Sequence, residues 1–307
     1  MIGFIVNPAS GNGRGSKVWK QLEEVLRNRK ISYRVQLTTG KHDAEQFAMD
    51  WSNETSEVTT IVAVGGDGTI HEAANGIYKA NTVNPAHHPK PLGYIPAGSG
   101  NDYARGHGIP LEPLLALEVV LSPSLSIRQI DLIKINHRIA VSSIGVGLDG
   151  RIARVTNQAS YKKLFNQLGL GGLSYVLSLV RVLLSYRTCS ATLSIDNKRI
   201  KATKVWLIAT ANIPFYGGGM RICPQADPAD GLAELCVVSA IHRAELLRVF
   251  PQVYKGTHIH HKGITFYQGR TIQIDAERPL DIHMDGEMAG TTPVTLEILP
   301  AILSIIV

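Results

Sequence analysis

Residues 59–69 read TTIVAVGGDGT, an apolar run that leads directly into a glycine-rich turn, and a helical pattern follows from about Ile70 to Lys79. Glycines let a backbone turn sharply and bring its N–H groups close to an anion. The positive end of the next helix favours phosphate. Asp67 would repel phosphate by itself, so its presence indicates a divalent cation. The stretch predicts a phosphate-binding strand–turn–helix unit; an ordinary turn with an acidic helix cap is the alternative.

The rest of the N-terminal part repeats this alternation of strand and helix. Short apolar runs alternate with amphipathic patterns, which is typical of a mostly parallel sheet covered by helices. The predicted strands are Ile2–Val6, Tyr33–Leu37, Thr59–Val64 and Leu92–Ile95, and the predicted helices include Lys17–Asn28 and Ala44–Trp51.

After Pro123 the pattern changes to successive strands, which predicts a second domain built as an antiparallel β-sandwich. We therefore expect an α/β nucleotide-binding domain over 1–126 and a β-sandwich domain over 127–294. A last strand within 295–307, either Thr295–Ile298 or Leu303–Val307, would return to the first domain. The predicted strands are Ile127–Ile135, Arg138–Ile144, Ala191–Ile195, Arg199–Ala211, Leu232–Val238, Ile264–Phe266, Thr271–Asp275 and Leu280–Met284, with helices at Leu173–Ser185 and His242–Tyr254.

Two further glycine-rich loops follow predicted strands of the first domain. Residues 7–15 read NPASGNGRG and residues 96–105 read PAGSGNDYAR. The first matches neither the GxxxxGK[ST] phosphate loop nor the GxGxxG dinucleotide fingerprint. In an open parallel sheet, loops at the carboxyl ends of the strands gather over one crevice. Three such loops therefore predict one phosphate-binding site.

Composition restricts the class of protein further. The chain has 307 residues, of which 44% are hydrophobic and 18% charged, and this balance is typical of a folded globular protein. Cys189, Cys223 and Cys236 form no CxxC pair, which disfavours a zinc site or a disulfide framework and favours a reducing cytosol. Arg181 interrupts the apolar segment 169–186, so we expect a helix buried on one side rather than a membrane span.

Basic residues concentrate in one part of the chain. Between 150 and 204 there are ten basic residues and one acidic residue, Asp196, an excess of nine in a chain whose net charge is +6. The pattern fits transient contact with an anionic membrane as well as it fits a solvated basic face. Few aromatic residues accompany the charges, which disfavours nucleic acid. The basic residues are Arg151, Arg154, Lys162, Lys163, Arg181, Arg187, Lys198, Arg199, Lys201 and Lys204.

Three histidines, His258, His260 and His261, lie close together near the end of the chain. His258 and His260 would share one face of a strand, but no acidic or cysteine partner lies at ligand spacing. We therefore expect a half-exposed strand there rather than a metal site.

The motifs together resemble the diacylglycerol kinase catalytic family, which also includes the sphingosine and ceramide kinases. The resemblance rests on NPASG at the start, Thr38 with Asp43-Ala44, GGDGT followed by HEAANG, PAGSGNDYAR, PQADPADG at 224–231, and Asp285-Gly286-Glu287. It covers essentially the whole chain in the right order. NAD kinases share GGDGT and resemble the family in fold, but the PAGSGND loop and the late DGE favour the lipid kinases.

The resemblance implies a role for individual residues. Asp285 would be the general base for the lipid hydroxyl, with Glu287 beside it and Asp67 in the catalytic site. His71 stands where Asn is usual and Ser99 where Thr is usual. The implied nucleotide-binding residues are Asn7, Pro8, Ala9, Ser10, Gly11, Thr38, Gly65, Gly66, Asp67, Gly68, Thr69, Ile70, His71, Ser99 and Asn101. The implied metal ligands are Asp67 and Asp102 for catalytic magnesium, and Asp227, Asp230 and Leu232 for a structural magnesium loop.

The resemblance implies an ATP- and Mg²⁺-dependent lipid kinase that acts in the cytoplasm and at the membrane surface. Its acceptor would be diacylglycerol, another glycerolipid or a sphingoid base. Taken without the resemblance, Asp285 is equally well a plain hairpin-turn aspartate. Two alternatives are an NAD kinase-like phosphotransferase and a regulatory protein that binds nucleotide and lipid without turnover. Open sandwich edges make a homodimer plausible.

Overall fold

The computed structural model describes residues 1–53, 57–83, 89–122, 126–158 and 182–307. The chain divides into two compact units. The α/β unit comprises Met1–Leu132, Gly217–Gly219 and Leu299–Val307, and the sandwich unit comprises Ile133–Tyr216 and Met220–Ile298. Strands β5 (Ile127–Ile135) and β15 (Val294–Ile306) contribute residues to both units. The domain limits inferred from the sequence, at 126 and 294, stay predictions.

The α/β unit is built on a parallel sheet. Its strands are β1 (Ile2–Val6), β2 (Tyr33–Leu37), β3 (Thr60–Gly65) and β4 (Leu92–Pro96), and they pair in the order β2-β1-β3-β4. The end of β15 joins this sheet, because Ile305 pairs with Leu92 in parallel. Every residue of β3 is buried, as expected for a central strand covered on both faces.

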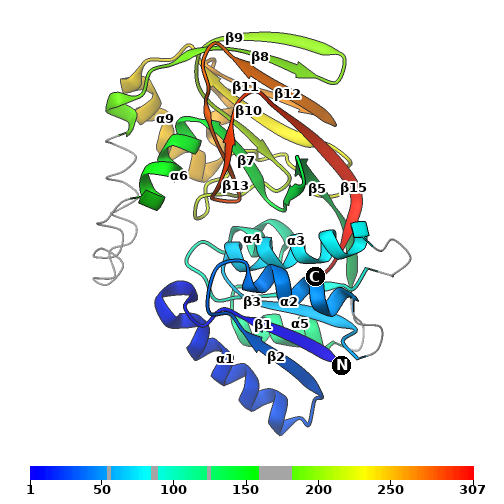
Figure 1. The fold of residues 1–307 in the computed structure, drawn as a ribbon. Helices are drawn as coiled ribbons and strands as arrows, with labels where there is room; N and C mark the ends of the chain where they lie inside the picture. The colour runs from blue at the N-terminus through cyan, green and yellow to red at the C-terminus, as the bar shows by residue number, and fades with distance from the viewer. Residues whose placement is uncertain (54–56, 84–88, 123–125, 159–181) are drawn as a thin grey trace. The chain divides into compact units, whose positions relative to one another are not determined.

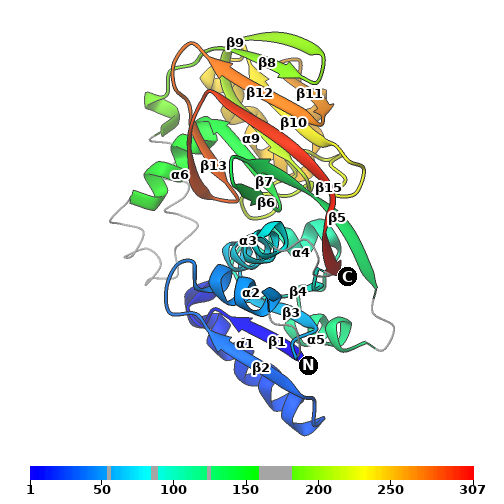
Figure 2. The ribbon, with the colours of Figure 1, turned by 45° about the vertical axis from the view of Figure 1, so that its right-hand side comes forward.

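Helices cover both faces of this sheet (Figure 1, Figure 2). Helix α2 (Asp43–Asn53) packs against α3 (Asp67–Val83) on one face, and α1 (Ser10–Asn28) packs against α5 (Pro113–Leu121) on the other. The short helix α4 (Asp102–His107) follows the loop after β4.

The sandwich unit is antiparallel in all the pairings that the described residues make within it. The strand order is β14-β13-β7-β9-β8-β12-β15, with β10 between β9 and β11, and β6 beside β5. Its other elements are β6 (Arg138–Ala140), β7 (Ser143–Gly147), α6 (Leu148–Gln158), β8 (Cys189–Ile195), β9 (Lys198–Ala211), β10 (Ala233–Ser239), α9 (Arg243–Lys255), the 3₁₀ turn η1 (Thr257–His260), β11 (Ile264–Gly269), β12 (Thr271–Ala276), β13 (Asp281–Met284) and β14 (Glu287–Thr291).

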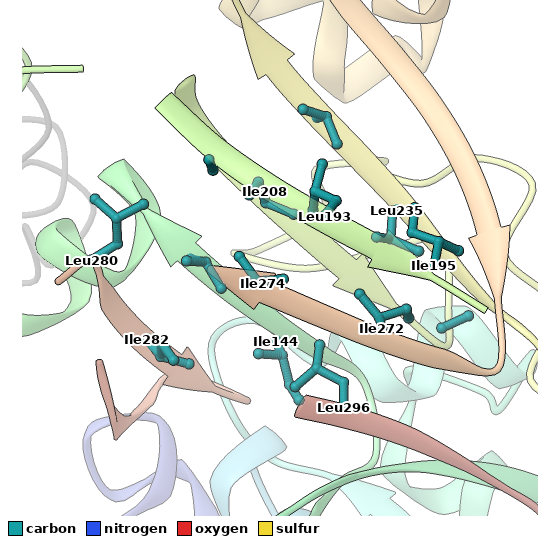
Figure 3. Close-up of a cluster of buried hydrophobic side chains, with 14 of the residues drawn as sticks. Ile144, Leu193, Ile195, Ile208, Leu235, Ile272, Ile274, Leu280, Ile282 and Leu296 are labelled. Carbon is teal, nitrogen blue, oxygen red and sulfur yellow. The ribbon is translucent and has the colours of Figure 1, made fainter. Parts of the chain in front are cut away.

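Two hydrophobic cores lie on opposite sides of β10, because successive side chains of a strand point to opposite faces. Leu235 and Val237 belong to the core between the strands, with Ile208 and Ile272. Cys236 and Val238 belong to the core under α6 and α9. Figure 3 shows the first core, in which Leu193, Ile274 and Leu296 are fully buried.

The predicted fold class, an α/β domain followed by an antiparallel β-sandwich, is confirmed. Strands at Ile2–Val6, Tyr33–Leu37 and Ile127–Ile135 have the predicted bounds. The strand predicted at Arg138–Ile144 is wrong as one element, since it divides into β6 and β7 at Val141 and Ser142.

The prediction of a strand through the three histidines is also wrong. Residues 257–260 form a 3₁₀ turn, and the His258 side chain is fully buried with Nε2 3.0 Å from the Ile222 carbonyl oxygen. His261 Nε2 lies 3.0 Å from Glu245 Oε1 on α9. The alternation of histidines therefore reflects packing against neighbouring elements, which local sequence does not reveal.

The apolar segment 169–186 falls mostly outside the described residues, which resume at Val182 with a helical turn through Ser185. The same applies to the helix predicted at Leu173–Ser185. Among the helices that the structure describes, none combines the length and apolar character needed to cross a bilayer.

Candidate phosphate-binding site and the carboxylates around it

The loop after β1 is tied to the loop after β3. The Asn7 N–H donates to the Val64 carbonyl oxygen at 2.9 Å, and the Asn7 side-chain amide donates to Thr69 Oγ1 at 3.2 Å. Asn7 Oδ1 also accepts the N–H of Ala9 at 3.1 Å. Ser10 then begins α1, whose next three residues, 11–13, have left-handed backbone angles before the helix continues to Asn28. Asn7 therefore fixes one loop against the other.

The glycine-rich turn after β3 forms the first turn of α3. Both Thr69 and Ile70 donate their N–H groups to the Gly66 carbonyl oxygen, at 2.9 and 3.3 Å. A Cβ atom at Gly65 would lie 2.3 Å from Thr69 Oγ1, so only glycine fits there. A Cβ atom added at Gly68, in contrast, would meet nothing within 4 Å. The turn thus presents open space at the N-terminal end of a long helix, where an anion is favoured.

The loop after β4 is held by Asn101, which has a left-handed backbone (φ 55°). Its side chain accepts the Gly98 N–H at 3.0 Å and donates to the Gly98 carbonyl at 3.1 Å. The buried Tyr94 hydroxyl reaches two loops, since it donates to the Gly65 carbonyl at 3.1 Å and to Asn101 Oδ1 at 3.4 Å. The sequence analysis did not identify Tyr94, an aromatic residue in a short apolar strand whose hydroxyl needs a buried partner.

The three glycine-rich loops meet at one place. Ala97 donates its N–H to the Gly65 carbonyl at 2.6 Å. A Cβ atom at Gly98 would lie 2.5 Å from Gly66 Cα, and one at Gly11 would lie 2.5 Å from the Ala97 carbonyl oxygen. These approaches require glycine, and they place the ends of β1, β3 and β4 around one space.

Two carboxylates, Asp67 and Asp102, border this convergence. A Cβ atom at Gly100 would lie 2.8 Å from Asp67 Oδ2 and 3.7 Å from Asp102 Oδ2. Burial raises the pKa of the Asp67 carboxyl above its ordinary value and the Asp102 charge raises it further, while the Tyr103 N–H, 3.0 Å from Asp67 Oδ1, opposes the shift. A cation placed here would relieve both the burial and the repulsion.

The segment Gly217–Gly219, far along the chain, also contributes to this site. Gly218 and Gly219 donate their N–H groups to the two oxygens of Asp102, at 2.6 and 2.7 Å. Arg105 lies 3.3 Å from the same carboxylate. The backbone of residues 217–219 has positive φ throughout (62°, 89° and 99°), which favours glycine. The Gly-Gly-Gly run was visible in the sequence, but nothing local indicates that its partner is Asp102.

The remaining predicted nucleotide residues differ in exposure. Ser99 is exposed, and Thr38 is half-buried with its N–H donated to the Val6 carbonyl at 2.8 Å. The side chains of Ile70 and His71 are fully buried. Asn75 donates to the His71 carbonyl at 2.9 Å within α3. Ile70 and His71 therefore support the loop from inside, and their side chains are covered by protein. Pro8 is half-buried beside Asn7.

In the sandwich unit, Asp285 occupies the turn between β13 and β14 with a left-handed backbone (φ 47°). Its carboxylate accepts three main-chain N–H groups, from Val141 at 2.8 Å, Ser142 at 3.0 Å and Ser143 at 2.8 Å. These bonds lie where β6 ends and β7 begins, which explains the interruption of the predicted strand. Glu287 forms an ion pair with Arg138 at 3.2 Å.

A buried acid–histidine pair lies two residues from Asp285, and the sequence analysis missed it. His283 Nε2 is 2.7 Å from Asp149 Oδ2, and both side chains are nearly inaccessible. Burial alone would lower the pKa of His283, but the Asp149 carboxylate, with a smaller contribution from Asp285, raises it above the ordinary value. The Gly286 N–H donates to His283 Nδ1 at 3.3 Å. The pair thus fixes the turn that carries Asp285.

The loop 224–231 contains the residues implied for a structural magnesium site. Asp227 Oδ1 accepts the Ala229 N–H at 3.0 Å, and Asp230 Oδ1 accepts the Leu232 N–H at 2.9 Å. The Glu234 carboxylate accepts the Gln225 N–H at 2.9 Å, and burial raises its pKa. The loop is therefore rich in carboxylate oxygens with local main-chain bonds.

No cluster of three or more His, Cys, Asp or Glu side chains suited to a metal ion occurs within the described ranges. Magnesium, however, is commonly held by one or two protein carboxylates with phosphate oxygens and water completing the shell. Asp67, with Asp102 beside it, fits that donor set, because burial and the Asp102 charge raise its pKa and its Oδ2 borders a glycine-lined space.

The α/β unit thus has the architecture of a phosphate-binding domain, and the comparisons agree. Residues 1–135 match the diacylglycerol kinase catalytic domain, and residues 142–307 match the YegS C-terminal NAD kinase beta sandwich-like domain. The chain belongs to the diacylglycerol kinase catalytic family of lipid kinases.

Individual relatives match this chain over nearly its full length. The chain is 28% identical over 291 residues to a diacylglycerol kinase of Bacillus subtilis (strain 168), covering 94% of this chain and 90% of the relative. It is 26% identical over 304 residues to a diacylglycerol kinase of Mycobacterium tuberculosis (strain H37Rv), covering 98% and 93%. A crystal structure of a diacylglycerol kinase from Bacillus anthracis str. Sterne has the same fold, with a TM-score of 0.72, 19% identity and coverage of 99% and 96%.

Proposed function

We propose that the protein transfers the γ-phosphate of ATP to the hydroxyl of a membrane lipid, with diacylglycerol as acceptor and phosphatidic acid as product. The observation that carries the proposal is the convergence of three glycine-rich loops on the N-terminal end of α3, with Asp67 and Asp102 at its edge. Phosphoryl transfer depends mainly on positioning and on neutralising charge, and this arrangement offers both.

In this proposal the α/β unit holds the nucleotide. Main-chain N–H groups of the turn 65–69 and the loop 7–11 face the phosphates, and Asp67 with Asp102 holds Mg²⁺, which neutralises charge on the transferred group. Asp102 also keeps the Gly217–Gly219 segment in place through its two main-chain bonds. Ser99 is exposed on the third loop and contributes its hydroxyl.

In the sandwich unit, Asp285 accepts the proton of the lipid hydroxyl. Three main-chain N–H groups hold its carboxylate in one orientation, and the pair of His283 with Asp149 fixes the turn beneath it. A base held in this way is oriented before the substrate arrives. Glu287 balances the charge of Arg138 beside it.

Recruitment to the membrane is part of the proposal. Among the basic residues of 151–204 that the structure describes, Arg151, Arg187 and Arg199 are exposed and suit an anionic surface. Lys162, Lys163 and Arg181 lie outside the described residues. A homodimer formed through open sandwich edges remains part of the proposal, and its test is the molar mass in solution.

The test is transfer of ³²P from γ-labelled ATP, with magnesium, to diacylglycerol, phosphatidylglycerol, sphingosine and ceramide in mixed micelles, and to NAD in solution. Labelled phosphatidic acid is expected. Labelled NADP would overturn the choice of acceptor class. No labelled product despite measured ATP binding would overturn turnover and favour a non-catalytic lipid-binding protein.

Variants test the roles proposed for Asp67 and Asp285. Asp67→Asn should reduce turnover by at least about a hundredfold, because one catalytic charge is lost. Asp285→Asn needs a parallel unfolding measurement, since Asn offers one acceptor oxygen where three N–H groups now bind. Asp275→Asn is the matched control: Asp275 is exposed on β12, and its carboxylate accepts the N–H of the adjacent Ala276. Full activity in a folded Asp285→Asn protein would remove Asp285 from the base role.

A further inference from the structure

A cavity of ≈ 430 Å³ lies within the sandwich unit. It is bordered by α6, by the helical turn at 182–185 and by the segment that leads into β13. Its wall contains four arginines, Arg151, Arg154, Arg187 and Arg278, and one carboxylate, Asp281. The volume falls in the range of small-ligand pockets, about 300–1,000 Å³.

The charges of this wall are unbalanced. Asp281 pairs with Arg154 at 2.6 Å and with Arg151 at 3.5 Å, so one carboxylate faces two guanidinium groups. No carboxylate within the described part of the chain forms an ion pair with Arg187 or Arg278. A concave surface that concentrates one sign of charge raises the local concentration of the opposite ion. The imbalance therefore favours an anion.

One arginine of this wall, Arg278, is also held in place by aromatic packing. The Arg278 guanidinium lies over the Tyr186 ring at 5.7 Å and donates to the Arg187 carbonyl oxygen. Tyr186 stacks on Trp206 at 5.9 Å between ring centres. The Arg243 guanidinium donates a hydrogen bond to the Tyr186 carbonyl oxygen at 2.7 Å. A guanidinium fixed before the ligand arrives loses less conformational entropy on binding.

We infer that this cavity binds a phosphate monoester, through the guanidinium groups of Arg187 and Arg278 with Arg151 and Arg154 beside them. A guanidinium presents paired N–H donors that match phosphate oxygens, and a monoester carries between one and two negative charges at neutral pH. Two sources offer this chemistry: a soluble phosphate ester and the head group of a lipid phosphate. The lipid source rests on the proposed function, because such a lipid is the product class of that reaction.

The experiment measures binding, not turnover, so its failure is distinguishable from failure of the proposed kinase activity. Full-length protein is titrated calorimetrically with glycerol 3-phosphate, and its flotation is measured with phosphatidylcholine vesicles with and without 10% phosphatidic acid (~0.1 M salt, where charge attraction persists over about 10 Å). The Arg187→Gln, Arg278→Gln double variant is compared with an Arg248→Gln, Lys255→Gln double variant. The control removes the same charge from exposed residues of α9, outside the basic region 151–204.

Wild type and control should bind at least one of the two ligands, and the arginine variant should bind it at least about tenfold more weakly, a difference of about 1.4 kcal/mol. If the arginine variant binds glycerol 3-phosphate more weakly, the site is open to soluble esters. If it binds only the vesicles more weakly, the ligand is a lipid head group. Equal binding by all three proteins, or equal loss in the control, overturns the inference. Arg187→Gln alone is the second variant if the double variant does not fold, because Arg187 is exposed.

Discussion

The contact between the second and third glycine-rich loops can be tested with one methyl group. A Cβ atom at Gly98 would lie 2.5 Å from Gly66 Cα, whereas carbon atoms pack at about 3.5–4.0 Å. Gly98→Ala therefore forces the two backbones apart by about 1 Å. Neither backbone can move without disturbing the bond from the Ala97 N–H to the Gly65 carbonyl, now 2.6 Å.

The expected cost follows from these contacts. Overpacking costs about 1–3 kcal/mol, and weakening one hydrogen bond adds about 1 kcal/mol. A protein of this size shifts its melting temperature by about 2–4 °C per kcal/mol, so thermal unfolding followed by circular dichroism resolves the effect. ATP binding should weaken with it, because the loops that border the proposed site no longer meet in the same way.

Gly68→Ala, two residues after Gly66, is the matched control. A Cβ atom there meets nothing within 4 Å. Alanine within a helix is favoured over glycine by about 0.5–1 kcal/mol, so the variant should be at least as stable as wild type. The added methyl group should nonetheless weaken ATP binding, since it occupies the space assigned to phosphate. A Gly98→Ala protein as stable as wild type would refute the reasoning about loop contact; unchanged ATP binding by Gly68→Ala would refute the placement of phosphate.

Three further variants test other parts of the structure. Asp102→Asn should lower the free energy of unfolding by about 1–3 kcal/mol in urea, because the Gly218 and Gly219 N–H groups lose a charged acceptor; unchanged stability would contradict this. Burial, aided by the Arg128 charge, lowers the pKa of His107 to about 3. The contribution of neutral His107 to the free energy of unfolding is therefore complete above pH 6.5 and falls as pH decreases towards 3. Urea unfolding at pH 7, 6 and 5 should show a smaller loss of stability with decreasing pH in His107→Leu than in wild type. Leu193→Ala should cost about 2–5 kcal/mol, whereas Leu184→Ala, at a side chain 72% exposed, should change stability by less than about 0.5 kcal/mol; equal effects would contradict the assigned core.

Hydrophobic periodicity in the sequence predicted helices and strands well where burial alone determines their limits. The strand Ile2–Val6 lies in the middle of a parallel sheet and reads as a continuous apolar run, so its limits follow from composition. The meeting of the three loops follows from topology, since carboxyl ends of parallel strands lie at one edge. No long-range contact is needed to predict either feature.

Elements were missed where a distant partner decides them. β15 is one strand of 13 residues, although the sequence suggested two shorter candidates, because its two ends pair with β12 and β4. The interruption at Val141–Ser142 arises from Asp285, which takes the N–H groups that a continuous ladder would use. The helix α4, which Asp102 begins, was not predicted, since six residues are too short for a clear helical period.

Asp102 of the α/β unit and Asp285 of the sandwich unit have structural partners that complicate the interpretation of mutations. Asp102 binds the N–H groups of Gly218 and Gly219, and Asp285 binds those of Val141, Ser142 and Ser143. Removing either carboxylate leaves main-chain donors without a charged acceptor, so activity would fall even if the carboxylate took no part in chemistry.

Asp67 differs from these two in that its Oδ1 accepts one main-chain N–H, from Tyr103 at 3.0 Å, which the amide oxygen of Asn can also accept. Burial and the neighbouring Asp102 charge raise its pKa, so the carboxylate is destabilised in its charged form by the protein itself. Removing that charge relieves the burial and the repulsion, so Asp67→Asn should be as stable as wild type or more stable. Loss of turnover with retained stability would separate a catalytic carboxylate from a structural one. Among the three aspartates, Asp67 thus gives the clearest test of the proposed chemistry.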